Sequence, residues 1–119
     1  MELYFGSLHG LNTEKENHNL VTFAIPDIGI KFKAPYPAGK MTLEYASLLT
    51  LLEFIEVNPQ LFTNRALELY SNNAELVDQI KNNRVTQMEL APLLQKALEY
   101  RTKLNFSIKW VPSHGENQF

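Results

Sequence analysis

The sequence holds few side chains that could perform nucleophilic or metal chemistry. It contains no cysteine, which excludes disulfides, thiolate catalysis and cysteine-ligated zinc. Its three histidines, His9, His18 and His114, are scattered and include no i,i+4 pair, so they do not form a pattern typical of zinc ligands. Ser71 and Ser113 have no base at a recognisable spacing, and phosphate-loop and dinucleotide motifs are absent. The carboxylates therefore remain as the candidates for chemistry.

Glu44 and Asn72 stand at the ends of predicted helices. An acid in the first turn is stabilised by the helix dipole, and asparagine is a good N-cap residue. A single carboxylate does not hold a cluster of divalent ions, which need several hard oxygen ligands. We therefore favour the interpretation that both residues stabilise helix ends. The less favoured alternatives are that Glu44 is a metal ligand and that Asn72 is a catalytic residue.

The elements that position these side chains follow from periodicity and turn residues. Alternating or β-branched runs predict strands, and apolar residues at helical spacing predict helices. The predicted strands are Glu2–Ser7, Asn19–Ile25, Gly29–Lys33, Arg65–Tyr70 and Asn105–Val111. The predicted helices run from the cap Thr42 to Val57, from Ala74 to Asn82, and from Gln87 to Leu104.

The helix ends carry recognisable signals. Asn72 or Asn73 is expected to cap the second helix, and Asn72 with Glu75 has the spacing of a capping box. A second capping box, formed by Thr86 with Glu89, is expected at the start of the third helix. Pro92 is then expected to kink this helix or divide it in two.

The element order β-β-β-α-β-α-α-β predicts an α/β (α+β) fold. Three successive strands imply an antiparallel meander, and the later β-α-β crossover is expected to add a parallel strand by a right-handed connection. We expect a mixed five-stranded sheet with helices packed on it, in a single domain covering residues 1–119.

The net charge and the hydropathy of the chain argue against some classes of protein. Eleven Lys and Arg against thirteen Asp and Glu give a net charge of −2, which argues against a strongly cationic nucleic-acid or membrane binder. Lys31 and Lys33 share a strand face, which we interpret as solvated surface. No signal peptide or membrane span is predicted, so we expect a cytoplasmic protein with no membrane partner. Four aromatic residues are expected in the core rather than as stacking platforms: Tyr4, Phe5, Tyr45 and Trp110.

Three segments together resemble the ribonuclease H family, in particular bacterial and archaeal type 1 ribonuclease H and the ribonuclease H domains of reverse transcriptases. The segment from Leu43 to Glu53 is similar to the first-helix motif A-E-Y-x-A-L-L-x-G-L-E. The segment from Leu69 to Ile80 is similar to V-Y-S-D-S-x-L-V-V-x-Q-I. Trp110-Val111-Pro112, followed by Asn117, resembles the W-V-P-x-x-x-N run. Order and spacing agree over most of the chain.

The resemblance implies a hydrolase that cuts the RNA strand of RNA–DNA hybrids with two Mg²⁺ ions held by four carboxylates. The first acid position falls on Phe5-Gly6-Ser7, so that Gly6 sits where an acid is expected. The second acid is kept as Glu44, and the third falls on Asn72, an amide. The fourth would follow Asn117, beyond Phe119, together with the family's C-terminal helix. The resemblance also offers His114 as a proton shuttle, although we favour a solvated loop histidine.

With one acid of four, we expect no cofactor and no two-metal hydrolysis. The resulting hypothesis is a catalytically inactive binding module for an RNA–DNA hybrid, another nucleic acid or a protein. The absent helix suggests an uncovered sheet face that binds a protein partner or forms a homodimer. The alternative is a residual Mg²⁺-dependent nuclease of RNA–DNA hybrids, which would need Glu2, Asp27 or Glu68 to reach Glu44.

Overall fold

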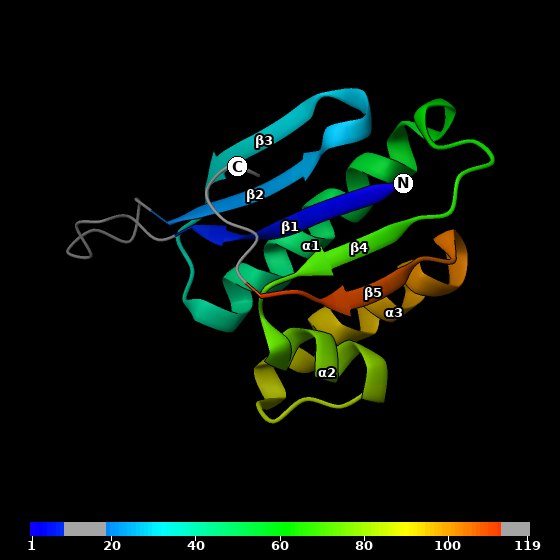
Figure 1. Cartoon of the computed structure of the whole chain (residues 1–119). Helices are drawn as coiled ribbons and strands as arrows, with labels where there is room; N and C mark the ends of the chain where they lie inside the picture. Colours follow the sequence, from blue (N-terminus) through cyan, green and yellow to red (C-terminus); the bar gives the residue numbers. More distant parts are fainter. Residues whose placement is uncertain (9–18, 113–119) are drawn as a thin grey trace.

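Five strands form one mixed sheet in the order β3-β2-β1-β4-β5 (Figure 1). The structure, a computed structural model, describes residues 1–8 and 19–112; the predictions on His9, His18, Ser113, His114 and Asn117 lie outside them. β1 pairs antiparallel with β2, which pairs antiparallel with β3, while β4 runs parallel to both β1 and β5. The predicted meander and crossover are confirmed. The strands are β1 Glu2–Leu8, β2 Leu20–Ile25, β3 Ile30–Pro35, β4 Glu68–Ser71 and β5 Ser107–Trp110.

Three α-helices cover one face of this sheet, as Figure 1 shows. They are α1 Lys40–Val57, α2 Ala74–Asn82 and α3 Ala91–Leu104; short 3-10 turns are η2 Pro26–Ile28, η3 Pro59–Leu61 and η4 Met88–Leu90. α1 lies on β1 and β2, and its predicted apolar positions Leu48, Leu51, Leu52 and Ile55 are all buried. No helix in the described residues is long and apolar enough to cross a membrane.

The helix starts differ from those predicted. α1 begins at Lys40 with Gly39 as its N-cap residue, two residues before Thr42. α3 begins at Ala91, because the segment with the predicted capping box forms the 3-10 turn η4 instead. Pro92 therefore lies in the first turn of α3, where its missing N–H has no intrahelical partner to lose. The predicted segment Gln87–Leu104 is thus divided just before Pro92, into η4 and α3.

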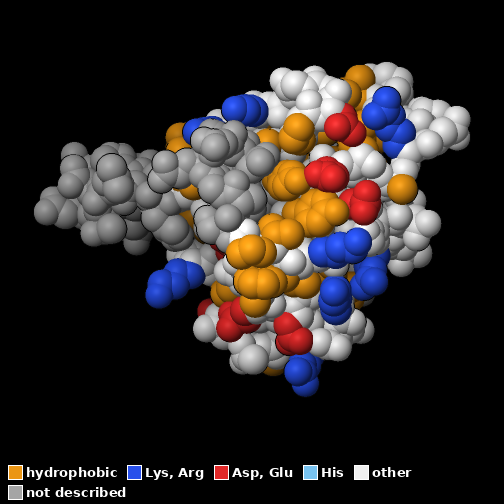
Figure 2. Space-filling view, viewed as in Figure 1, with side chains coloured by type: hydrophobic (Ala, Val, Ile, Leu, Met, Phe, Trp, Pro, Cys, Tyr) orange, Lys and Arg blue, Asp and Glu red, His pale blue; other side chains and the backbone are white. Residues whose placement is uncertain are grey.

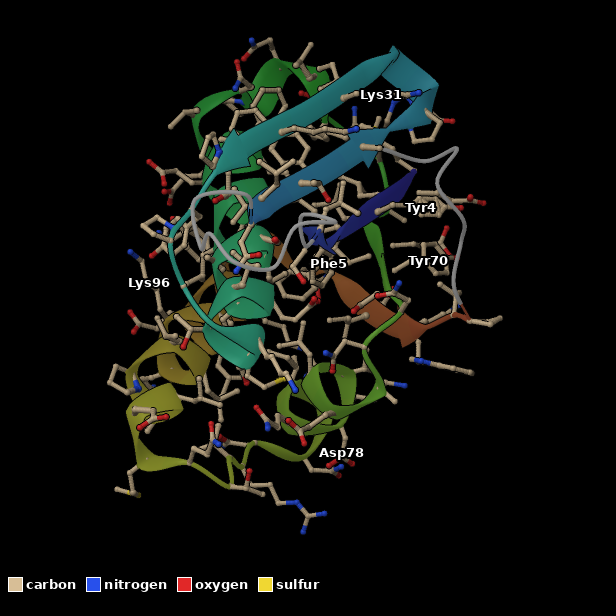
Figure 3. The ribbon with its side chains drawn as sticks, turned by 90° about the vertical axis from the view of Figure 1, so that its left-hand side faces the viewer. Tyr4, Phe5, Lys31, Tyr70, Asp78 and Lys96 are labelled. Atoms are coloured by element: carbon tan, nitrogen blue, oxygen red, sulfur yellow. The ribbon has the colours of Figure 1, made fainter. Side chains whose placement is uncertain are left out.

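Alternation along the strands separates two faces of the sheet. Phe5 is fully buried on the helix side, whereas Tyr4 and Tyr70 lie together on the opposite side (Figure 3). Their rings stack with centroids 5.3 Å apart. The prediction that all four aromatics belong to the core is confirmed for Phe5 and Tyr45. It is wrong for Tyr4, whose strand position faces away from the helices, and for Trp110, which is 50% exposed.

Candidate functional site

The carboxyl ends of β1 and β4 meet at one edge of the sheet. The two strands are parallel neighbours, so Gly6, near the end of β1, lies beside Asn72, which directly follows β4. The first half of α1 packs against the same edge and contributes Glu44. The structure thus brings together three residues that the sequence singled out: Gly6, Glu44 and Asn72.

Glu44 ties α1 to β1. Its side chain is buried, and its Oε2 atom accepts hydrogen bonds from the Ser7 backbone N–H at 3.2 Å and from the Ser7 hydroxyl. Hydrogen bonds to an ionised group are stronger than those between neutral groups. Glu44 therefore has a structural task in this site that does not depend on a metal ion.

The backbone of Gly6 is held from two sides. Its carbonyl oxygen accepts a hydrogen bond from the Thr22 hydroxyl at 2.6 Å and another from the Ser47 hydroxyl at 2.8 Å. Ser47 lies almost one turn after Glu44 on α1, so both side chains fasten the helix to β1. Among residues 1–8 and 19–112, a Cβ atom on Gly6 would have a single neighbour within 4 Å, the Asn72 Oδ1 atom at 3.9 Å. The position thus has room for a side chain.

Asn72 does not cap α2. The Asn73 side chain is the cap, because its Oδ1 atom accepts the Leu76 N–H at 2.9 Å. The Asn73 N–H in turn donates to the Ser71 hydroxyl at 3.0 Å, which leaves the Asn72 side chain turned toward Gly6. The predicted capping box of Asn72 with Glu75 is therefore wrong by one residue.

The three acids that a residual nuclease would need do not join Glu44. Glu2 and Glu68 are paired neighbours at the opposite, amino-terminal ends of β1 and β4. Glu2 accepts a hydrogen bond from the Tyr4 hydroxyl at 2.6 Å, and Glu68 pairs with Lys109 at 3.8 Å. Asp27 pairs with Arg65 at 4.0 Å. The direction of the strands and the alternation of side chains along them keep these acids away from Glu44. For Glu68 the sequence alone could not decide this.

The donor set of the site does not fit two divalent ions. Glu44 is the single carboxylate among the three residues, and the Asn72 amide carries no charge. Within residues 1–8 and 19–112, no group of three or more His, Asp or Glu side chains is placed to hold a metal ion. We therefore derive no step that depends on a metal.

Two further residues border the site and were not predicted there. Lys40, exposed in the first turn of α1, precedes Glu44 by four residues and so lies on the same helix face. Trp110 donates its indole N–H to the Asn72 carbonyl oxygen at 3.3 Å. The i,i+4 spacing could have revealed Lys40, whereas the position of Trp110 depends on strand pairing.

The sheet face turned away from the helices is chemically mixed. In Figure 2 hydrophobic side chains gather over the middle of this face, with acidic and basic groups beside them. The strand register assigns Tyr4, Tyr70, Glu2, Glu68, Lys31 and Lys109 to this face. Lys31 and Lys33 share it, as predicted.

The similarity of this chain to known proteins is found in the structure and not in the sequence. No family model and no curated protein matches the sequence. Among solved structures, an RNase H1 isolated from compost by a metagenomic approach superposes with a TM-score of 0.73 and 13% identity over 94% of this chain and 84% of its own. The same protein in complex with an RNA/DNA hybrid gives a TM-score of 0.76 and 14% identity over 98% and 87%. The chain has a ribonuclease H-like fold.

A second ribonuclease H supports the same conclusion. RNase H1 from the halophilic archaeon Halobacterium salinarum gives a TM-score of 0.68 and 19% identity over 98% of this chain and 89% of its own. The predicted ribonuclease H-like fold and the mixed five-stranded sheet are thus confirmed. At these identities the likeness shows the fold alone.

Proposed function

We propose that this domain binds RNA–DNA hybrids and does not cleave them by the two-metal mechanism. The observation that carries the proposal is the site itself, where Gly6 and Asn72 face each other and Glu44 is the only carboxylate of the three. Two divalent ions about 4 Å apart repel each other by roughly 16 kcal/mol even at an effective dielectric of about 20. One carboxylate offers little compensation for that repulsion.

The choice of ligand rests on the fold and on one cation. The compost RNase H1, which has the same fold, was solved in complex with an RNA/DNA hybrid. Lys40 is exposed one helical turn before Glu44 and on the same face of α1, where it can contact a phosphate group. These observations support a nucleic-acid ligand at the β1–β4 edge.

Fluorescence anisotropy tests the ligand. A labelled RNA–DNA hybrid is titrated with the protein at two salt concentrations, beside duplex DNA and duplex RNA of the same sequence. Saturable binding that weakens steeply with salt supports the proposal, because phosphate contacts release counterions. Absence of binding at low salt contradicts it.

Two other hypotheses remain predictions. A protein partner or a homodimer at the sheet face opposite the helices is tested by light scattering during size-exclusion chromatography. Residual Mg²⁺-dependent nuclease activity is tested by following the integrity of the RNA strand. The cytoplasmic location also stays a prediction.

A further inference from the structure

Trp110 is the only tryptophan of the chain, and it is half exposed at the end of β5. Phe106 and Ile108, just before β5 and within it, are buried, so on the face of β5 that these residues share with Trp110 only the last position is exposed. A large apolar ring in contact with water is unfavourable, and exposed tryptophan is enriched where proteins bind ligands. The ring borders the edge that carries Asn72 and Gly6.

The indole is fixed in place by the segment that forms the site. Its N–H donates to the Asn72 carbonyl oxygen at 3.3 Å, and the next residue, Val111, donates its backbone N–H to the Ser71 carbonyl at 2.9 Å. The ring is thus held beside the turn between β4 and α2. A ligand that contacts it does not have to order a freely rotating side chain.

The hydrogen bond also limits what the ring can offer a nucleic acid. Indole has a single donor and no acceptor, and that donor is already used by Asn72. The exposed part of the side chain therefore offers ring surface for stacking instead of a hydrogen bond for reading a base edge. Bases inside a duplex are already stacked on their neighbours, so an unpaired base is the partner that gains most from such a surface.

We infer that Trp110 stacks on an unpaired base next to a hybrid bound at the β1–β4 edge. This inference rests on the proposed function and defines its ligand more closely. The preferred ligand is an RNA–DNA hybrid with a single-stranded extension instead of a blunt hybrid. Trp110 adds affinity for the extension and makes no contribution to pairing or cleavage.

The experiment compares a blunt hybrid with the same hybrid extended by a few unpaired nucleotides on either strand. Anisotropy of the labelled nucleic acid measures affinity, and the emission of the single tryptophan reports contact at Trp110 directly. We expect the extended hybrid to bind about tenfold more tightly. We also expect it to quench the tryptophan emission, whereas the blunt hybrid does not.

Two variants assign the difference to the ring. Trp110→Leu removes the aromatic surface and is expected to bind both hybrids with the affinity of the wild-type protein for the blunt one. Trp110→Phe keeps a smaller ring and is expected to retain part of the preference. Circular dichroism of both variants shows whether the sheet is intact before binding is compared.

Each outcome separates the inference from the proposed function. Equal affinity for the two hybrids, or a preference that survives in Trp110→Leu, overturns the role of Trp110 while hybrid binding stands. Unchanged tryptophan emission on saturation with the extended hybrid overturns it as well. Failure of both hybrids to bind the wild-type protein contradicts the proposed function itself.

Discussion

The Oδ1 atom of Asn72 lies 3.9 Å from the place that a Cβ atom on Gly6 would occupy. The two residues lie at neighbouring strand ends. The amide of Asn72 faces the hydrogen atom that Gly6 has in place of a side chain. Gly6 has no positive φ, and no other described residue comes within 4 Å of that place, so neither the backbone conformation nor the packing of the described residues demands a glycine. The backbone positions for a pair of acidic side chains are therefore present, but neither position carries a carboxylate.

Replacing both residues by aspartate is expected to create a site for divalent cations. The Gly6→Asp/Asn72→Asp variant places two facing carboxylates at the strand ends, one residue from Ser7, which Glu44 contacts. Clustered carboxylates are what Mg²⁺ and Mn²⁺ require. We expect its affinity for Mn²⁺, measured by isothermal titration calorimetry, to exceed that of the wild-type protein by about tenfold or more.

The control is Glu44→Gln in the same double variant, which removes one of the three charges. We expect most of the new affinity to disappear. Mn²⁺ affinity that is equal in the double variant and the wild-type protein would show that Gly6 and Asn72 do not converge on a common site.

Glu44→Ala is expected to destabilise the domain even without a metal ion. The substitution removes the acceptor for the Ser7 N–H and hydroxyl, and hydrogen bonds to a charged group contribute about 1.5–3 kcal/mol. We expect the free energy of unfolding in urea to fall by about 2 kcal/mol. Glu53→Ala, on the exposed side of the same helix, is the matched control and should change it little. Equal stability of the two variants would refute the structural role of Glu44.

Lys40→Gln is expected to weaken hybrid binding and reduce its salt dependence. Loss of one phosphate contact lowers the slope of log affinity against log salt by about 1. Lys103→Gln is the matched control, since Lys103 lies near the end of α3 and pairs with Glu56 at 2.6 Å. Anisotropy titrations at several salt concentrations measure both. A slope that is unchanged in Lys40→Gln would remove Lys40 from the interface.

Alkaline pH is expected to destabilise the domain through Tyr45. Burial, assisted by the charge of Glu75, raises the pKa of Tyr45 from 10.0 to about 12. Because the folded-state pKa lies above the unfolded one, the contribution of Tyr45 to stability is complete below pH 10 and is lost as the pH rises toward about 12. Chemical denaturation at a series of pH values measures this loss.

The matched variant for this effect is Tyr45→Phe. It loses the hydrogen bond that Tyr45 donates to Gln79 Oε1 at 2.7 Å, and leaving that buried acceptor unsatisfied costs about 1–3 kcal/mol at neutral pH. Its stability should fall less than that of the wild-type protein above pH 10. The remaining loss is shared by Tyr4, whose pKa is raised to about 12 by its hydrogen bond to Glu2, and by Tyr70 and Tyr100, whose pKa values are raised by burial. Identical pH profiles of variant and wild type would exclude Tyr45 as the source.

Local patterns in the sequence predicted most of the fold. The helix Ala74–Asn82 has the predicted bounds, and the antiparallel meander and the parallel crossover follow from the element series, whereas the order of the strands in the sheet was not predicted. The starts of α1 and α3 were predicted less well, because α1 begins after Gly39 without a side-chain cap and the predicted capping box of α3 lies in η4. The choice of cap for α2 was also open. Asn72 and Asn73 are both good caps, and only the backbone at the end of β4 decides for Asn73.

Predicting the geometry of the site requires the tertiary structure, because its residues come from separate segments of the chain. Sequence motifs identified Gly6, Glu44 and Asn72, but their approach depends on the parallel pairing of β1 with β4 and on the packing of α1. The exposure of Trp110 was missed for a similar reason. Alternation placed it with Phe106 and Ile108, whereas the strand ends at Trp110, whose indole bonds to the Asn72 carbonyl.

The most direct test of the central claim follows binding and integrity of one hybrid in one experiment. An RNA–DNA hybrid labelled on its RNA strand is titrated with the protein in Mg²⁺, and samples from each point of the anisotropy curve are resolved on a denaturing gel. We predict saturable, salt-sensitive binding with the RNA strand intact at saturation. Mg²⁺-dependent cleavage that is lost in Glu44→Ala would contradict the claim that this site cannot support two-metal hydrolysis.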